Sequence, residues 1–170
     1  MGASWVTDEM RAALGSELGR KVSFPVDESD IRRWVIATWY PAAPPRRYWD
    51  DDAIAAAGGL VAPDDFNPFA WMTVPPAGAE PDLARGGYRG PEQSLGLEPP
   101  ATTSIINGGR VATYREPMRA RDVITSVNRL TDYFEREGRL GLMLFTLTTD
   151  TWTNQRGDTV KTEVTTFIRY

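Results

Sequence analysis

The two side chains that most often carry enzyme chemistry are missing from this sequence, which holds neither histidine nor cysteine among its 170 residues. Without histidine there is no imidazole general base, no Ser-His-Asp triad and no histidine-ligated metal site. Without cysteine there is no thiolate nucleophile, no disulfide and no Cys-type zinc site. The remaining candidates for chemistry are carboxylates, glycine-rich turns and clustered aromatic side chains.

Carboxylates gather at two places in the first half. Asp50-Asp51-Asp52 precedes the alanine-rich run 53–57, and Gly58-Gly59 follows it. This pattern is typical of a short helix with acids at its positive end and glycine at its exit. Helix capping explains it better than a metal cluster, because hard metal ions need further oxygen ligands at defined spacing. We therefore expect no metal site. Asp64-Asp65 opens a further helical turn, for which a carboxylate active site is the alternative interpretation.

Glycine and aromatic residues offer two other patterns. Asn107-Gly108-Gly109 lies within a strand-like run and is too short to cradle a dinucleotide, so it predicts a β-bulge. The chain has no Walker loop and no Gly-x-Gly-x-x-Gly turn after a strand, and no cofactor is expected. Tryptophans near a proline-rich stretch either form the core or line an apolar ligand pocket. Those in question are Trp34, Trp39, Trp49 and Trp71.

Charge and length exclude several classes of protein. The 19 basic and 23 acidic residues give a net charge of −4, with no basic stripe, so nucleic acid and anionic membranes are poor candidates for partners. No signal peptide and no membrane-spanning apolar run is visible, which predicts a cytoplasmic protein. The length and a hydrophobic fraction of 41% predict a single domain over residues 1–170.

The elements that must position any site follow an α+β plan, with helices first and then an antiparallel meander. Proline and glycine fill residues 60–100, where 77–101 predicts a long irregular loop. The run 140–152 is apolar on both faces, so both faces should be covered. The helical stretches are 7–18, 27–39, 53–57 and a few turns within 66–73; the strands are 20–25, 102–114, 122–134, 140–152 and 159–169.

Several short runs, in order, resemble a MaoC-like dehydratase of the (R)-specific enoyl-CoA hydratase family, in particular its N-terminal, catalytically empty type. The resemblance covers residues 18–170 and implies a hot-dog fold, an antiparallel sheet wrapped on a central helix. Here Pro68 and Pro75-Pro76 would shorten that helix. The runs are 31–37 (IRRWVIA), 45–50 (PRRYWD), 58–63 (GGLVAP), 105–110 (IINGGR), 114–117 (YREP), 119–122 (RARD), 136–139 (REGR), 141–143 (GLM) and 154–157 (NQRG).

The resemblance also identifies what is missing. The family's catalytic motif is an Asp, four residues, then a His, with a second Asp two residues further on. If Asp50 is that second Asp, the His place falls on Tyr48 and the first Asp place on Ala43. No catalytic residue is therefore expected in this chain, because a phenol holds its proton at neutral pH and is a poor general base.

Family enzymes pair an empty hot-dog domain with an active one. The resemblance therefore implies a non-catalytic, substrate-channel-forming subunit of a heteromeric enoyl-CoA hydratase (3-hydroxyacyl-CoA dehydratase). Its partner would be a MaoC-like subunit carrying the Asp-x4-His motif, in a heterodimer or heterotetramer. The coenzyme A thioester would be the substrate, and no cofactor is implied.

A shortened central helix would leave a wide pocket for a bulky acyl group such as a steroid side chain, unless 77–101 folds back and fills it. Two other functions stay open. One is a stand-alone hot-dog thioesterase using Asp64, Asp65 or Glu92, and the other is an acyl-CoA-binding module. The residues expected to bind substrate are Trp39, Tyr48, Phe66, Phe69, Trp71, Met72, Asn107 and Gly108.

Overall fold

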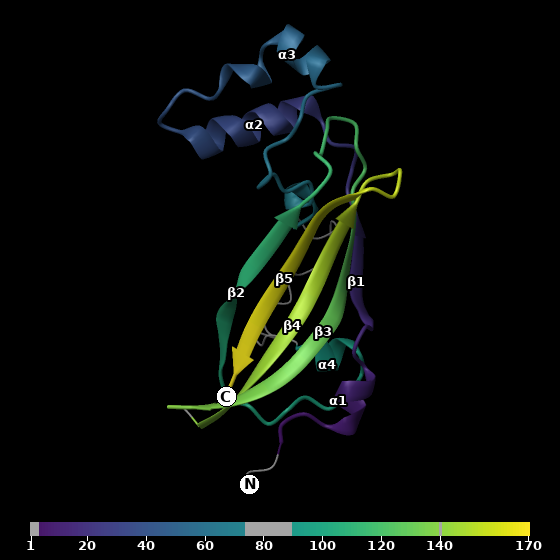
Figure 1. Ribbon diagram of the computed structural model, residues 1–170, viewed down its shortest axis with the longest axis vertical. Coiled ribbons are helices and arrows are strands. Elements are labelled where there is room, and N and C mark those ends of the chain that lie inside the picture. The colour runs from purple at the N-terminus through teal and green to yellow at the C-terminus, as the bar shows by residue number, and fades with distance from the viewer. Residues whose placement is uncertain (1–3, 74–89, 140) are drawn as a thin grey trace, which may run out of the picture.

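A five-stranded antiparallel sheet forms the centre of the protein (Figure 1). The structure is a computed structural model that describes residues 4–73, 90–139 and 141–170. The strand order is β1-β3-β4-β5-β2, so the first two strands of the chain form the two edges. The strands are β1 (Glu17–Val22), β2 (Ile105–Tyr114), β3 (Thr125–Gly138), β4 (Gly141–Thr153) and β5 (Thr159–Arg169). The predicted α+β order with an antiparallel sheet is confirmed.

The early helices begin close to where the sequence predicts, but the first, expected over 7–18, ends at Ala12, because Gly15 has a positive φ of 85° and residues 17–22 form β1. Asp27 caps α2 (Glu28–Trp39) by accepting a hydrogen bond from the Ser29 backbone, and Thr7 caps α1 (Asp8–Ala12). The side chain of Asp50 accepts from the Ala53 backbone at 3.1 Å and caps α3 (Asp51–Ala56). The acidic run thus acts as a helix start, as expected from its position. A short 3-10 helix, η1 (Arg46–Tyr48), connects α2 to α3.

Helices lie at the two ends of the sheet (Figure 1). Helices α2 and α3 project beyond one end, while α1 and the four-residue α4 (Pro91–Ser94) lie at the other. Two separate hydrophobic clusters correspond to these ends. The larger cluster includes Ile31, Phe66 and Trp152, and the smaller one includes Met10, Leu130 and Leu144.

The predicted bulge in the strand 102–114 is present in β2. The pairing of β2 with β5 shifts between Asn107 and Gly109. The Asn107 side chain accepts a hydrogen bond from the Gly109 backbone at 2.8 Å, and Gly109 has a φ of 111°. Only glycine adopts such a backbone without strain, which explains the residue type.

Two expectations about the second half need correction. Strand β4 alternates, with Leu144, Thr146 and Thr148 buried on one face while Phe145 on the other is only half-buried, so the described residues bury one face rather than both. We call the buried side the inner face. The predicted loop 77–101 contains α4, because Gly90-Pro91 opens a helical turn. Residues 77–89 of that loop lie outside the described part.

After Pro63, where the central helix was expected, residues 60–73 hold a single 3-10 turn, η2 (Ala70–Thr73). The prolines at 75 and 76 belong to a stretch that the structure does not describe.

Candidate functional site

Tyr48, to which the resemblance assigns the place of the family's histidine, is 2% exposed. Its hydroxyl accepts a hydrogen bond from Nη2 of Arg47 at 3.0 Å, and the same guanidinium lies 4.9 Å from the centre of the ring. Trp39 and Trp49 contact the ring from other sides, at centroid distances of 6.2 and 6.3 Å. The hydroxyl and the ring of Tyr48 are thus both in contact with the guanidinium of Arg47, which holds the side chain in place.

Ala43, to which the resemblance assigns the place of the family's first aspartate, is exposed on the turn after α2. A methyl group offers no proton acceptor there. The two positions that the resemblance assigns to water activation therefore hold an exposed alanine and a buried tyrosine that is hydrogen-bonded to Arg47.

Tyr48 and Trp39 meet in a cavity of about 640 Å³ between the α2–α3 region and the segment 59–65. The walls are mostly aliphatic and aromatic, with Arg47 and two carboxylates as the charged groups. The volume lies within the range of small-molecule sites. The lining residues are Trp39, Arg47, Tyr48, Ala53, Ile54, Ala57, Gly59, Leu60, Val61, Ala62, Pro63, Asp64 and Asp65.

Backbone pairing holds one wall of this cavity. Ala62 donates to the carbonyl of Met118, and Ala120 donates to the carbonyl of Leu60, each at 2.9 Å. The side chain of Arg119 reaches the carbonyl of Ala57 at the end of α3. The segment that precedes β3 therefore fixes both the 60–62 wall and the exit of α3.

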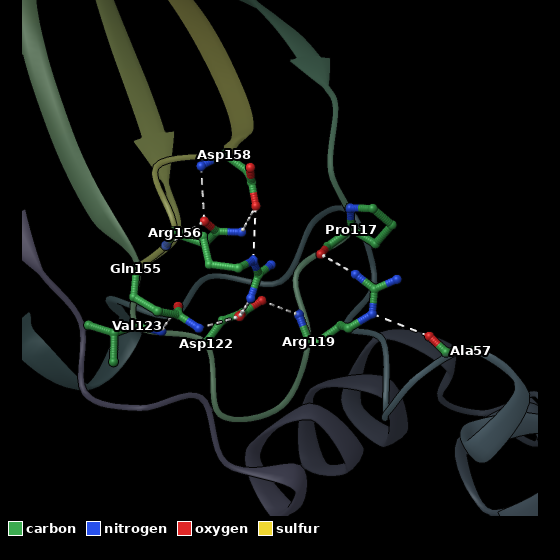
Figure 2. A network of polar contacts seen from close by, with 9 residues as sticks. Ala57, Pro117, Arg119, Asp122, Val123, Gln155, Arg156 and Asp158 are labelled. Atoms are coloured by element: carbon green, nitrogen blue, oxygen red, sulfur yellow. Dashed lines mark hydrogen bonds and ion pairs between the residues drawn. The ribbon is translucent and has the colours of Figure 1, made fainter.

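A polar network in turn fixes the segment that precedes β3 (Figure 2). Asp122 is 3% exposed, and its carboxylate accepts from the Arg119 backbone at 2.8 Å and from Gln155 at 3.0 Å. Arg156 pairs with the same carboxylate at 3.4 Å and with Asp158 at 3.0 Å. The β4–β5 turn is thereby connected to the cavity wall, and each polar group of the buried carboxylate has a partner.

The other residues expected to bind substrate do not line this cavity, although Phe66 and Phe69 share a hydrophobic cluster with Tyr48. Phe66 and Phe69 are buried in the larger hydrophobic cluster, where Phe69 packs edge-on against Trp152. Met72 is 41% exposed, and the side chain of Trp71 lies outside the described part. Asn107 and Gly108 lie on the exposed edge strand β2, away from the cavity. The structure therefore brings together two of the eight residues, Trp39 and Tyr48.

A second hollow, of about 360 Å³, lies on the inner face of the sheet between β1 and α4. We call it the inner groove. Its floor is polar and combines hydroxyl, amide and carboxylate side chains from three strands. Sequence reasoning missed it, because alternating threonines and serines in a strand look like a solvated face. It is lined by Leu18, Gly19, Lys21, Pro91, Ser94, Ser126, Asn128, Thr148, Asp150, Thr165 and Phe167.

Glu92, a candidate carboxylate for thioester cleavage, is fully buried on α4. Its oxygens accept from Nη1 and Nη2 of Arg169 at 2.9 and 2.8 Å, and the hydroxyl of Tyr133 donates to the same carboxylate. Burial alone would raise the pKa of Glu92, but the hydrogen bonds from Arg169 and Tyr133 outweigh it and hold the pKa below its ordinary value. The carboxylate is thus an ionised partner of Arg169 and does not line either hollow.

Within residues 4–73, 90–139 and 141–170, no group of three or more acidic residues is placed to hold a metal ion. No helix of this part of the chain is both long and apolar enough to cross a membrane.

The order of the five-stranded antiparallel sheet, with helices at its two ends and Tyr48 beside a cavity, is that of a hot-dog protein of the MaoC-like dehydratase class. Residues 12–163 match the family described as FAS1-like, dehydratase domain region. The chain belongs to this family. No curated protein sequence matches it significantly.

Solved structures share the fold at low sequence identity. The ChsH1-ChsH2 complex from Mycobacterium tuberculosis has a TM-score of 0.63 and 19% identity, covering 95% of this chain and 87% of that chain. The truncated HadBC (3R-hydroxyacyl-ACP dehydratase) complex from the same organism has a TM-score of 0.54 and 18% identity, with coverages of 91% and 96%. A MaoC-like dehydratase from Rhodospirillum rubrum has a TM-score of 0.53 and 17% identity, with coverages of 93% and 92%. The predicted hot-dog fold is confirmed.

Proposed function

We propose that this chain is the non-catalytic subunit of a heteromeric enoyl-CoA hydratase and acts with a MaoC-like partner that carries the Asp-x4-His motif. The observation that carries the proposal is the pair of catalytic positions, where Ala43 is exposed and Tyr48 is buried against Arg47. Neither group deprotonates water at neutral pH. The reaction is the addition of water to an enoyl thioester or its reverse, with the acid–base groups supplied by the partner.

An exposed edge strand supports a partner. Every residue of β2 is exposed, and Val111 is 69% exposed. A ten-residue edge strand of this kind leaves unpaired backbone groups and apolar side chains in water, which proteins usually avoid. Two of the similar structures, ChsH1-ChsH2 and HadBC, are complexes of two different chains by their names. We infer that β2 pairs with the catalytic subunit and that the assembly is a heterodimer or heterotetramer.

The size of the cavity supports a bulky acyl group, for example the thioester of a steroid side chain. Its volume of about 640 Å³ has walls that include Trp39, Ile54 and Leu60. Apolar surface buried there contributes about 25 cal/mol per Å², which a short linear chain cannot use fully. The cytoplasm, where acyl-CoA is available as substrate, is the proposed location.

A coupled assay tests the proposal. The purified chain is assayed for enoyl-CoA hydration, first alone and then with a MaoC-like subunit encoded by an adjacent gene. Free thiol is followed in the same samples. We expect hydration only when both chains are present and no thiol release. Robust hydration by the chain alone would contradict the proposal.

A thioesterase is the second candidate, because Asp64 and Asp65 line the cavity. A carboxylate facing a thioester bound in this cavity would be the general base that activates water for its hydrolysis. Release of free thiol by the chain alone, lost in Asp64→Asn or Asp65→Asn, would favour it. Ligand binding with neither activity would favour a pure acyl-CoA-binding module.

A further inference from the structure

The middle of the inner face is polar although both of its ends are apolar. Trp152 and Val160 belong to the larger hydrophobic cluster at one end, and Leu130 and Leu144 belong to the smaller cluster at the other. Between them lies the floor of the inner groove, formed by Ser126, Asn128, Thr148, Asp150 and Thr165. Neighbouring positions pair directly across the strands, Asn128 with Asp150 and Thr148 with Thr165, so these side chains form one continuous patch.

Part of this patch is internally satisfied. The carboxylate of Asp150 accepts from the hydroxyl of Ser126 at 2.7 Å and from the indole nitrogen of Trp152 at 2.9 Å. It is therefore held as a fixed acceptor rather than left to recruit a cation. Lys21, exposed on the edge strand β1, is the positively charged residue that lines the groove. The groove offers one positive and one negative group, which favours a neutral ligand over an anion.

Asn128 is the unsatisfied member. Its Oδ1 is buried and has no hydrogen-bond partner in the described part of the chain. Burying a hydrogen-bond acceptor without a partner lowers the stability of the folded state, because the acceptor loses its hydrogen bonds to water. Such a group in a native structure calls for an explanation. A ligand that completes the hydrogen bonds of Asn128 supplies one. A ligand hydroxyl can pair with either end of the Asn128 amide, because a hydroxyl is both a donor and an acceptor. It donates to Oδ1 or accepts from Nδ2, depending on how the terminal torsion of Asn128 is rotated.

We propose that the inner groove binds a neutral, hydroxyl-bearing part of the acyl group, with Asn128 as the residue that selects for the hydroxyl. This rests on the proposed function in taking an acyl-CoA as ligand, and it adds the chemical class of the acyl group. A purely hydrocarbon group would leave Asn128 unpaired in a desolvated site, and a carboxylate would face Asp150. Phe167 adds one apolar contact at the side of the groove.

Direct binding tests the inference independently of hydration. The probes are cholyl-CoA, whose rings carry hydroxyls, and cholanoyl-CoA, whose rings carry none, measured by calorimetry on the purified full chain. We expect cholyl-CoA to bind at least tenfold more tightly, and Asn128→Leu to reduce that ratio to near one. Thr151→Val on the outer face of β4 is the matched control and should leave the ratio unchanged, because Thr151 does not line the groove.

A second measurement covers the case in which Asn128→Leu changes the fold. Without ligand, its melting temperature should equal or exceed that of the unmodified chain, since a buried acceptor without a partner is removed. If the variant unfolds, Thr165→Val decides in its place, and an unchanged binding ratio in that variant overturns the inference. Thr165→Val, which removes a hydroxyl with little change of shape, should still lower the binding ratio.

The outcomes separate the two proposals. Equal binding of both probes, binding of neither, or a hydroxyl preference unchanged in Asn128→Leu would overturn the inference about the groove. Partner-dependent hydration without a hydroxyl preference would leave the proposed function intact. If the chain prefers the hydroxylated probe but shows no hydration with its partner, the proposed function is rejected and the inference about the inner groove is retained.

Discussion

Glu92 and Arg169 form a bidentate ion pair that joins α4 to the end of β5, with both side chains almost entirely buried. The guanidinium also donates to Oγ1 of Thr146 at 2.6 Å, and Tyr133 donates to Glu92. One residue of the long proline- and glycine-rich stretch is thereby fixed to the last strand. The pair explains why a four-residue helix keeps a defined place on the sheet, where its own backbone hydrogen bonds would not suffice.

Breaking this pair should be costly. We expect Glu92→Ala to lower the free energy of unfolding by about 3–5 kcal/mol, because Arg169 is left buried without a counter-charge. Urea titration followed by tryptophan fluorescence measures the change. Glu17→Ala breaks an exposed pair with Arg20 and serves as the control, for which a much smaller effect is expected. A double replacement, Glu92→Leu with Arg169→Met, should recover most of the loss.

The same pair makes stability depend on pH in one direction. The pKa of Glu92 is lower in the folded chain than its ordinary value of 4.5, so the folded state prefers the ionised carboxylate. The contribution of Glu92 is fully present above that ordinary value and is lost as the pH falls through the lower, folded-state pKa. Unfolding free energies of the unmodified chain and Glu92→Gln should therefore begin to converge as the pH falls below 4.5, and converge fully only below the lowered folded-state pKa. A difference that stays constant down to pH 2 would contradict this.

The proposal that β2 pairs with the catalytic subunit can be tested by placing a charge on that strand. Val111→Lys places an ammonium on the most exposed apolar side chain of that edge, and should prevent association with the catalytic subunit. The matched control is Val22→Lys on the opposite edge strand β1, where the valine is 49% exposed. Size-exclusion chromatography with light scattering distinguishes the free chains from the complex. Loss of the complex in the β1 variant alone would place the interface at the other edge.

The polar network around Asp122 should stabilise the cavity wall. Asp122→Ala leaves the Arg119 backbone amide and the Gln155 amide without their acceptor, and we expect a loss of about 1–3 kcal/mol. Hydrogen exchange should accelerate at Arg119 and at the paired segment 60–62. Asp30→Ala, which removes the half-buried partner of the exposed Arg33, should leave both unchanged.

Restoring the family's catalytic side chains should not create an active enzyme. In Ala43→Asp with Tyr48→His, the aspartate would lie on an exposed turn and the histidine in a buried site shaped around Arg47 and Trp39. Catalytic groups need positions held to within about 0.5 Å, which a substitution alone does not provide. Hydration assays of this variant without a partner should stay at background. Robust turnover would contradict this, because it would show that the geometry of a catalytic site is retained and that only its two reactive side chains are missing.

Local signals were enough to predict much of the fold. Asp27 and Asp50 mark helix starts because a side-chain oxygen satisfies a free backbone amide in the first turn, an interaction within three residues of sequence. Asn107 and Gly109 mark a bulge for an equally local reason. Gly109 has a positive φ, and its backbone amide donates to the side chain of Asn107, two residues earlier. The absence of histidine, visible by inspection, already excluded the family's acid–base pair.

The tertiary structure decided what depends on distant partners. Glu92 and Asp64 look alike in the sequence, yet one is buried against Arg169, 77 residues away, and the other lines a cavity. Phe66 and Trp39 are equally aromatic, but only Trp39 lies beside Tyr48. The polar patch at Asn128 and Thr165 appears only when β3, β4 and β5 align in register. Burial and electrostatic environment arise from contacts across the fold, so residue type and spacing alone do not assign them.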